Sequence, residues 1–486
     1  MGGMTAASLL ARDGYSVLVL EASHVPGGCS SSYYRKGYIF ESGATTLIGF
    51  DQNQPLRILE KELGIELPKK PISPSMTVHM GSRKIIRWQN RKEWINEAIS
   101  HFQEAEAQRS FWKTAYFVSD IVWKVSGRNR FFPPTNLSDA LKLLKNDPRD
   151  VRILPYALQS VKMFATSCGI TNPAFFKFLD EQLLISAQSY SNDTPFLFGA
   201  PAITYTNYTN FYVPGGLIKM VEALRDFIER RDGKVVTKKK VKSIERVQEV
   251  YKVTTDRDDI FCGQHVISNV PVWNMRDITH GQMGEYFENQ SKRYDWAWGA
   301  FTMGIATDDV YAPDMTLHHQ IHVENGEELD LPGFNSVFVS FSSKGDTERA
   351  PKGERVLNVS THTVPDFWFK LNGDYESVKK RFEENILVLL RKRLPGFSNA
   401  NVKLVFSSTP VTWKNWVYRA KGRVGGIPQS MNRSLLDWTP ANTPFEGLYL
   451  CGDTVYPGQG IPGVTLSGIN VYSRVKQKTN HHTRSH

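Results

Sequence analysis

A short apolar run that ends on a carboxylate is the first part of this chain whose residue types suggest chemistry. Residues 16–20 are rich in β-forming side chains, and Glu21 follows them directly. In dinucleotide-binding α/β units, an acidic side chain at the tip of the second strand accepts hydrogen bonds from the two hydroxyls of a ribose. A solvated surface carboxylate is the alternative. Because the strand has a buried pattern, the sequence favours Glu21 as a ribose acceptor.

A glycine pair follows Glu21 closely. Gly27 and Gly28 carry no Cβ, so they would let the backbone pass close to a phosphate or a ring. A serine run that begins at Ser30 adds hydroxyl groups that can donate to phosphate. An ordinary loop is the alternative. The carboxylate and the glycine pair together are more typical of a flavin nucleotide site than of a nicotinamide site.

The segment before Glu21 fits the second half of a G-x-G-x-x-G fingerprint. Gly2 and Gly3 stand at the start of an expected helix, and Gly3 fits the third glycine. The acidic residue of the fingerprint follows after about 20 residues, where Glu21 stands. The first strand and the first two glycines would then precede Met1. We expect the upstream reading frame to encode them; the alternative is a chain that lacks part of its phosphate loop.

A second strand-to-loop signal lies near the end of the chain. Residues 447–451 form the expected strand, Gly452 and Asp453 close it, and a glycine-rich loop at 457–464 leads into a helix. Asp453 is a candidate ligand-binding carboxylate, with helix capping as the alternative. The start of the helix directs backbone N–H groups and a positive dipole end toward a bound group. The candidate contacts in this loop are Gly460, Ile461, Gly463 and Val464.

The elements that must position these residues come from separated parts of the chain. A chain of 486 residues exceeds the usual size of one domain. Strand and turn patterns predict a discontinuous α/β nucleotide-binding domain, interrupted by a substrate domain. The expected nucleotide-binding parts are residues 1–75, 211–275 and 441–476. The expected inserts are residues 76–210, mainly helical, and residues 276–440, with an antiparallel sheet over a pocket; residues 477–486 form a polar tail.

The charge balance requires an explanation, since 59 basic and 49 acidic residues give a net charge of +10. The densest basic run lies at 230–242, and a solvated face is its simplest interpretation. No recognised module for nucleic acid accompanies the run, so we expect no nucleic-acid partner. Attraction to anionic lipid headgroups is the second interpretation.

The cysteine pattern and the hydropathy indicate where the protein is located and whether it holds a metal. The four cysteines are scattered without metal-ligand or redox spacing, which predicts reduced thiols in the cytoplasm and no metal site. The chain has no stretch of 18 uninterrupted apolar residues, so we expect no spanning helix.

Taken together in order, these motifs resemble those of the phytoene desaturase, carotenoid isomerase and retinol saturase superfamily of FAD oxidoreductases, over nearly the full length. The resemblance implies an α/β fold, with a Rossmann-like FAD-binding domain of the glutathione-reductase type and an inserted α+β substrate domain. It also implies FAD as the cofactor. The strings that carry it, besides those above, are residues 40–45, 213–216, 241–244 and 266–269.

The resemblance also implies roles for further residues. Gly43 and Ala44 would let the chain pass close to the ring system, with a simple tight turn as the alternative. Val241 would offer backbone hydrogen bonds to adenine, although a core strand residue would look the same. Many relatives carry arginine after the glycine pair, where this chain has Cys29. The loop at 457–464 would face the O2 and N1 edge of the flavin.

No catalytic triad or metal constellation emerges, which fits a reaction whose hard chemistry belongs to a cofactor. We interpret the chain as an FAD-dependent oxidoreductase that desaturates, saturates or isomerises a long apolar polyene or isoprenoid substrate. The electron acceptor or donor is not indicated. Two alternatives stay open: a flavin amine oxidase, and a non-enzymatic isoprenoid-binding protein of the GDP-dissociation-inhibitor type.

An aromatic segment suggests where an apolar substrate enters. Residues 111–132 combine a helical apolar pattern with basic neighbours. Core packing is the default interpretation, and a segment that lies at a membrane surface is the alternative. Because a polyene dissolves in lipid, we expect a cytoplasmic protein that associates peripherally with a membrane. Phe175, Phe196 and Phe198 are candidates for an apolar substrate tunnel, or simply pack.

Overall fold

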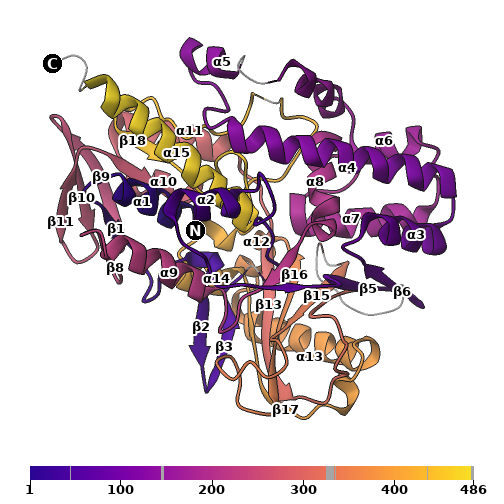
Figure 1. Ribbon diagram of the computed structural model, residues 1–486. Helices are drawn as coiled ribbons and strands as arrows, with labels where there is room; N and C mark the ends of the chain where they lie inside the picture. The colour runs from indigo at the N-terminus through magenta and orange to yellow at the C-terminus, as the bar shows by residue number, and fades with distance from the viewer. Residues whose placement is uncertain (44, 144–146, 325–332, 334, 435, 483–486) are drawn as a thin grey trace.

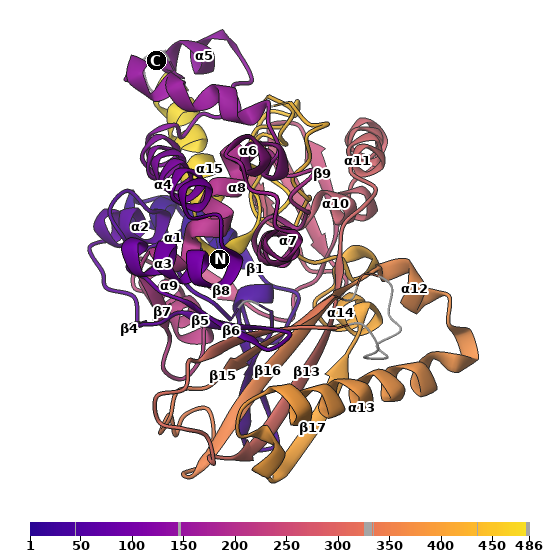
Figure 2. The same ribbon diagram turned by 90° about the vertical axis from the view of Figure 1, so that its right-hand side faces the viewer.

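The computed structural model describes all residues except 44, 144–146, 325–332, 334, 435 and 483–486 (Figure 1). Ala44 therefore lies outside the described residues. Helices and strands from distant parts of the chain form a nucleotide-binding layer, a large mixed sheet and a helical layer (Figures 1 and 2).

The nucleotide-binding layer is held together by strands from all three predicted parts. β1 (Leu18–Leu20) pairs in parallel with β8 (Lys234–Val236). β12 (Val266–Ser268) pairs in parallel with β18 (Leu448–Leu450). Each pair joins residues that are more than 150 positions apart, so this layer is built from segments that are distant in the sequence.

Helices cover these short strands. α1 (Gly2–Arg12) packs against α9 (Ile218–Glu229) and α15 (Gly460–His482), and α2 (Pro55–Leu63) packs against α1 and α15. α2 ends at Gly64, whose φ of +67° is the left-handed conformation that glycine adopts without a Cβ penalty. An antiparallel meander and two helices complete the layer: β9 (Val241–Val247), β10 (Val250–Thr255), β11 (Ile260–Gly263), α10 (Val272–Ile278) and α11 (Gly281–Arg293).

A seven-stranded sheet lies beside this layer, with the strand order β17-β13-β16-β15-β14-β5-β6. Its pairs are antiparallel except β14 with β5, which is parallel. The strands β5 and β6 come from the start of the segment for which the sequence predicts mainly helices. α13 covers one face of the sheet (Figure 2). The bounds are β5 (Met76–Met80), β6 (Arg83–Arg87), β13 (Gly299–Asp308), β14 (His318–His322), β15 (Ser336–Phe341), β16 (Glu354–Thr363), β17 (Val402–Ser408) and α13 (Tyr375–Arg393).

The helical layer is built around a dense aromatic core. Trp94, Trp112 and Phe178 are fully buried, and the rings of Trp94 and Trp112 meet edge to face at 5.1 Å. Rings packed in this way stabilise the layer beyond the area they bury. The layer contains α3 (Arg91–Phe102), α4 (Ala105–Arg128), α5 (Leu137–Leu143), the 3-10 segment η2 (Pro148–Ala157), α6 (Val161–Ser167), α7 (Pro173–Ala187) and α8 (Phe196–Thr204).

Shorter elements connect the layers. The hairpin β2–β3 projects below the sheet in Figure 1. The remaining elements are β2 (Ser32–Arg35), β3 (Tyr38–Glu41), β4 (Lys70–Ile72), β7 (Asn210–Tyr212), α12 (Pro365–Phe369) and α14 (Pro410–Trp416).

Candidate active site

A cavity of about 1730 Å³ runs from the nucleotide-binding layer to the large sheet. Its wall includes the start of α1, the ends of β1 and β12, and the loop before α15. It continues along α7, α8, β13 and β16. A site for one drug-sized ligand usually occupies about 300–1,000 Å³. The cavity therefore has room for a dinucleotide and a second molecule.

The predicted cofactor residues come together on one part of this wall. The structure brings together the described candidates of the N-terminal, middle and C-terminal blocks, although no ligand tests their roles, which stay predictions. They are Gly2, Gly3, Glu21, Gly27, Gly28, Ser30, Gly43, Val241, Gly452, Asp453, Gly460, Ile461, Gly463 and Val464.

Gly2 stands where the blocks approach one another most closely. A Cβ at this position would lie 2.7 Å from Oδ1 of Asn269 and 3.0 Å from the carbonyl oxygen of Val464. It would also lie 3.3 Å from the amide nitrogen of Gly452. A Cβ here would force these neighbours to shift, and residues 2–4 at the start of α1 line the cavity. The start of a helix suits an anion, so this part fits the pyrophosphate of a dinucleotide.

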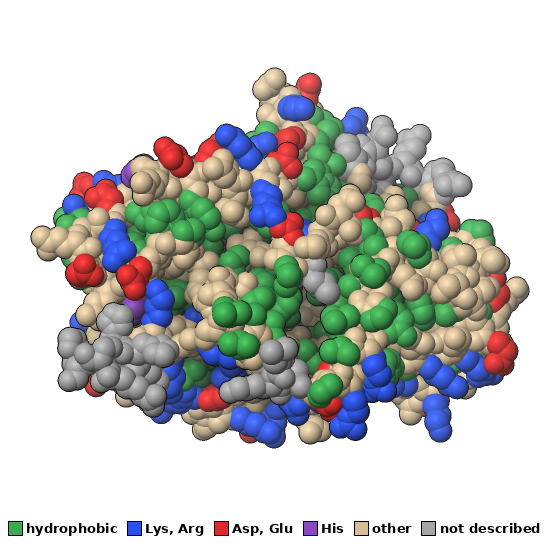
Figure 3. Space-filling model, turned by 90° about the horizontal axis from the view of Figure 1, so that it is seen from above, with side chains coloured by type: hydrophobic (Ala, Val, Ile, Leu, Met, Phe, Trp, Pro, Cys, Tyr) green, Lys and Arg blue, Asp and Glu red, His purple; other side chains and the backbone are tan. Residues whose placement is uncertain are grey.

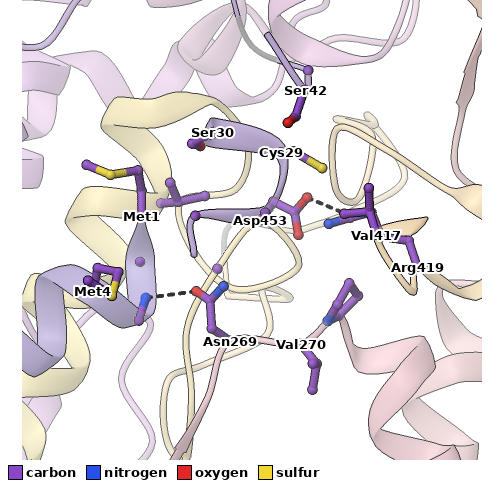
Figure 4. Close-up of a pocket in the computed structure, with 18 of the residues that line it drawn as sticks. Met1, Met4, Cys29, Ser30, Ser42, Asn269, Val270, Val417, Arg419 and Asp453 are labelled. Atoms are coloured by element: carbon purple, nitrogen blue, oxygen red, sulfur yellow. Dashed lines mark hydrogen bonds and ion pairs between the residues drawn. The ribbon is translucent and has the colours of Figure 1, made fainter. Parts of the chain in front are cut away.

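Asn269 fixes this approach from the end of β12. Its Oδ1 accepts a hydrogen bond of 2.9 Å from the amide of Gly3 (Figure 4). The sequence places Asn269 in one of the family-like strings but gives no signal for this contact. Only the fold brings residues 3 and 269 together.

Glu21 lies at the tip of β1 as the sequence predicts. Its amide donates to the carbonyl of Val236, and its carboxylate accepts from the amide of Ser23 at 2.8 Å. Burial raises the pKa of the Glu21 carboxyl, against the lowering by the Ser23 amide. The side chain lines the cavity, in a position that suits a ribose hydroxyl pair.

The glycine pair forms a tight turn against α9. Gly27 has a φ of +109°, and a Cβ there would lie 2.9 Å from Cγ2 of Val221. Gly43 packs on the same turn, because its Cβ would lie 3.0 Å from the carbonyl oxygen of Cys29. These glycines bring the chain close to the cavity on the side opposite Asn269.

Asp453 is paired with an arginine that the sequence did not single out. Nη2 of Arg419 lies 2.7 Å from Oδ2 of Asp453, with Cys29 beside the guanidinium (Figure 4). Burial lowers the pKa of Arg419, but Asp453 raises it, and the net direction is upward. Burial raises the pKa of the Cys29 thiol, so the thiol is neutral at pH 7. No residue pattern around position 419 signals this pairing.

Along α7, α8, β13 and β16 the cavity wall mixes apolar side chains with uncharged polar ones, and it includes one of the three predicted tunnel residues. Phe198 lines the wall, and its ring lies 5.5 Å from that of Trp438. Phe175 and Phe196 do not line the cavity; they are fully buried in the helical core. Phe175 packs on Phe102, and Phe196 packs on Phe164. The tunnel prediction is therefore wrong for these two, because their helix faces point toward neighbouring helices.

Two polar residues of this wall contact each other near the cofactor part. Nε2 of Gln188 lies 3.0 Å from Nε2 of His362, and both residues line the cavity. Burial lowers the pKa of His362 to about 4, so the imidazole is neutral at pH 7. Gly425 packs on Gln188, and the next residue, Gly426, packs on the carbonyl of Asp453. This pair therefore lies at the junction of the two parts, and no sequence motif indicates it.

Glu181 on α7 is a buried acid behind the cavity wall. It accepts a hydrogen bond from the hydroxyl of Ser336, which lines the cavity. Burial raises the pKa of the Glu181 carboxyl from 4.5 to about 7; Ser336 lowers the pKa and Asp180 raises it.

The raised pKa of Glu181 predicts a pH-dependent stability. The folded state binds the proton more tightly than the unfolded state, so this stabilisation is complete below pH 4.5 and is lost as the pH rises through about 7. Glu181→Gln should remove this dependence. Compared with the variant, the wild type should lose up to about 3 kcal/mol between pH 4.5 and pH 8 in denaturant titrations. A constant difference between the two proteins would contradict the prediction.

Among the described side chains, no group of three His, Cys, Asp or Glu residues is arranged to hold a metal ion. The four cysteines have free thiols. Within the same described part of the chain, no helix has the length and apolar character needed to cross a bilayer.

Comparison with known proteins identifies the class. Residues 1–475 match the family model described as flavin containing amine oxidoreductase, and the chain belongs to this family. It is a flavin-dependent oxidoreductase, which agrees with the convergence of glycines and carboxylates described above.

Relatives and solved structures refine this result. The chain is 26% identical to the chloroplastic prolycopene isomerase of Daucus carota, over 98% of this chain and 78% of the relative. It is 23% identical to the neurosporene-forming phytoene desaturase of Rhodobacter capsulatus, over 96% of this chain and 91% of the relative. An oxidoreductase from Methanosarcina mazei shares the fold with a TM-score of 0.65 and 18% identity, over 97% of this chain and 98% of that structure.

These comparisons confirm the predicted superfamily, the predicted fold class and the prediction of a flavin-dependent enzyme. The non-enzymatic alternative is therefore set aside. A flavin amine oxidase stays a related alternative. A putrescine oxidase shares the fold with a TM-score of 0.60, but the identity of 12% carries no information on substrate.

Proposed function

We propose that this chain is an FAD-dependent oxidoreductase that acts on a long apolar polyene, as a desaturase, a saturase or a cis-trans isomerase. One observation carries the proposal: the same cavity joins the predicted cofactor residues to a compartment along α7, α8, β13 and β16 whose described lining side chains are uncharged. The names of the carotenoid-modifying relatives support the same substrate class. The electron acceptor or donor is not assigned.

Each of the predicted cofactor residues would contact a different part of FAD. Glu21 would accept from a ribose, and the N-terminal amides of α1 would bind the pyrophosphate. Asp453 would accept from the ribitol chain, and the amides at the start of α15 would face the flavin edge. Bound FAD supplies hydride transfer to or from a substrate carbon. The chain itself then has to orient the polyene and exclude water.

The compartment along α7, α8, β13 and β16 favours a neutral substrate over an amine, because the described side chains of its wall are uncharged there. Among the described residues of α7, α8, β13 and β16 that line it, no side chain is charged at pH 7. A charged substrate would lose its hydration there without a compensating partner. His362 and Gln188 provide a polar contact next to the cofactor part. This contact would fix the position of the polyene substrate along the compartment.

Product analysis tests the proposal. The purified protein, reconstituted with FAD, should convert cis- or partly saturated polyenes presented in liposomes, and chromatography should detect the products. Benzylamine and putrescine, assayed through peroxide release, should give no turnover. Turnover of amines with no change in any polyene would overturn the proposal in favour of an amine oxidase.

We further propose that the protein associates peripherally with a cytoplasmic membrane face, through a different surface from the aromatic helix. The interpretation of residues 111–132 as a membrane segment is wrong for its first part, since Phe111, Trp112, Ala115 and Val118 are fully buried. Exposed apolar side chains instead gather on α5, η2 and α6. This apolar surface consists of Leu137, Leu141, Val151, Leu154, Leu158 and Met163.

The neighbours of this surface support an anionic bilayer as its partner. Arg149 and Arg152 are exposed within it, and basic side chains attract anionic headgroups. Figure 3 views the molecule from the side of α5 and shows hydrophobic groups with basic side chains along one edge. η2 packs on α4 and α8, and both helices also line the cavity. Substrate taken from lipid would thus enter through neighbouring helices.

Substitution within this surface tests the association. Leu154→Asp with Leu158→Asp should reduce flotation with anionic liposomes at low salt by about tenfold or more, because each loses apolar burial and adds repulsion. Val388→Asp is the matched control, since Val388 is 61% exposed on α13, outside this surface. Equal flotation of both variants, or no flotation of the wild type, would contradict the proposal.

A further inference from the structure

Arg419 differs from the other basic residues that line the cavity. The described lysines and arginines of the wall are Arg35, Lys239, Lys240, Lys242, Lys414 and Arg419. Of these, Arg419 is the one classed as buried, with 9% of its surface exposed. Burial of a guanidinium costs free energy unless anions or acceptors surround it. The position of Arg419 therefore requires partners.

The partners of Arg419 in the protein satisfy only part of its capacity. Nε donates to the carbonyl oxygen of Arg423, and Nη2 donates to Oδ2 of Asp453 at 2.7 Å. A guanidinium carries five N–H donors in one plane, so these two bonds leave further donors. The sulfur of Cys29 accepts a further hydrogen bond from the guanidinium, and the neutral thiol adds no negative charge. With these three partners, two of the five donors remain for a ligand.

The position of the guanidinium relative to the predicted cofactor residues indicates what it would bind. Cys29 follows the glycine pair, and Asp453 follows Gly452, whose amide lies close to Gly2 at the start of α1. Arg419 thus lies beside the glycine turn and the strand end, and in Figure 4 Asp453 lies between it and the start of α1. All three elements line the cavity.

We propose that Arg419 binds the pyrophosphate of the dinucleotide, bidentately, while Asp453 holds the guanidinium in place. Arginine matches the geometry of phosphate oxygens, and its fork adds direction as well as charge. Without Arg419, a pyrophosphate would have to bind near the uncompensated carboxylate of Asp453. This inference rests on the proposed FAD dependence and assigns one residue to one part of the cofactor.

Titration with ADP and with FAD tests this assignment on the full chain. ADP contains the pyrophosphate but no flavin or ribitol, so it isolates the contact. Arg419→Gln should weaken the binding of ADP and of FAD alike, by about tenfold to hundredfold, as expected for a lost hydrogen bond to a charged group. Arg419→Lys keeps the positive charge but lacks the planar guanidinium. Its affinity for ADP and FAD should lie between those of the wild type and of Arg419→Gln. Calorimetry measures ADP binding, and the quenching of flavin fluorescence measures FAD binding.

Two further variants separate this role from a structural one. Asp453→Asn should weaken ADP binding less than Arg419→Gln does, because the arginine stays but loses the ion pair that holds it. The same variant should weaken FAD binding more than ADP binding, because the carboxylate would also contact the ribitol. Arg12→Gln is the control, since it breaks the ion pair with Glu62 outside the cavity and should change neither affinity. Thermal unfolding is recorded for each variant, and the comparison is restricted to proteins that melt as the wild type does.

The outcomes are distinguishable from a failure of the proposed function. If the wild type binds neither FAD nor ADP, the FAD dependence itself fails. If the wild type binds both and Arg419→Gln lowers only FAD affinity, or Arg419→Gln and Asp453→Asn have the same effect on ADP, the pyrophosphate assignment is overturned. If Arg419→Gln does not fold, Arg419→Lys decides: unchanged ADP affinity in that variant overturns the assignment.

Discussion

Gly426→Ala is expected to abolish flavin binding, although residue 426 lies in a loop and carries no functional group. Its φ is +74°, and a Cβ would lie 2.1 Å from the carbonyl oxygen of Asp453. The strand end before Asp453 cannot yield freely, because the amide of Cys451 donates to Ser268 and that of Gly452 donates to Ser467. The variant must displace either Asp453 or the segment that carries Gly425.

The size of this effect follows from two separate costs. A left-handed φ and an overpacked backbone contact together cost about 2–6 kcal/mol. Flavin content after purification and thermal unfolding measure the outcome, and we expect less than about a tenth of the wild-type flavin. Gly64→Ala is the matched control, because Gly64 has a φ of +67° and no atom within 4 Å of its Cβ position. It should cost about 1 kcal/mol and keep the flavin. Equal flavin content in the two variants would refute the argument.

The parts of the site that the sequence predicted depend on local signals. Glu21 closes β1, and Gly27 and Gly28 form the turn that follows, all within a dozen residues. Because the strand end, the carboxylate and the glycine pair are close in the sequence, their spacing alone indicates how they lie relative to one another. The loop before α15 is predictable for the same reason. These motifs reach the cavity together because the βαβ-type order of the segments determines which strand ends meet.

The parts that the sequence missed depend on contacts between distant residues. Gln188 and His362 meet across 174 positions, and Gly3 and Asn269 meet across 266. Gln188 and His362 belong to no motif. Gly3 and Asn269 each stand in a predicted string, but nothing in either string indicates that the two residues meet. Arg419 is a single basic residue in a loop, and only the fold shows that it is buried beside Asp453. Periodicity and spacing cannot predict such pairs.

The aromatic helix shows a different limit, because its pattern fits two environments equally well. An apolar stripe with basic neighbours predicts a helix, and α4 (Ala105–Arg128) confirms the helix. The same stripe can face a protein core or a bilayer, and the pattern does not contain the partner. The structure places α3, α7 and α8 against it. The exposed apolar residues follow in α5 and η2, where the periodicity is weaker.

Trp112→Asp should therefore unfold the helical layer rather than weaken membrane binding. Trp112 is fully buried, its Nε1 donates to Oε1 of Gln108 at 2.9 Å, and its ring packs on Trp94. The substitution removes a large side chain and buries a carboxylate without a partner. Loss of the ring alone costs about 3–5 kcal/mol, and the buried charge adds to it. The total approaches the whole stability of a typical domain, about 5–15 kcal/mol.

Limited proteolysis and near-ultraviolet circular dichroism should detect this loss, as rapid cleavage within residues 91–204 and a collapsed aromatic signal. Trp112→Phe is the control, since it keeps an aromatic ring and loses one hydrogen bond, at a cost of about 1–3 kcal/mol. Leu158→Asp, on a side chain that is 78% exposed, should leave both signals unchanged while it reduces flotation with liposomes. A soluble, protease-resistant Trp112→Asp protein that has lost only liposome binding would contradict this prediction and support α4 as the membrane-binding helix. If Trp112→Asp loses stability and Leu158→Asp loses only liposome binding, Trp112 belongs to the core and Leu158 to the membrane-binding surface.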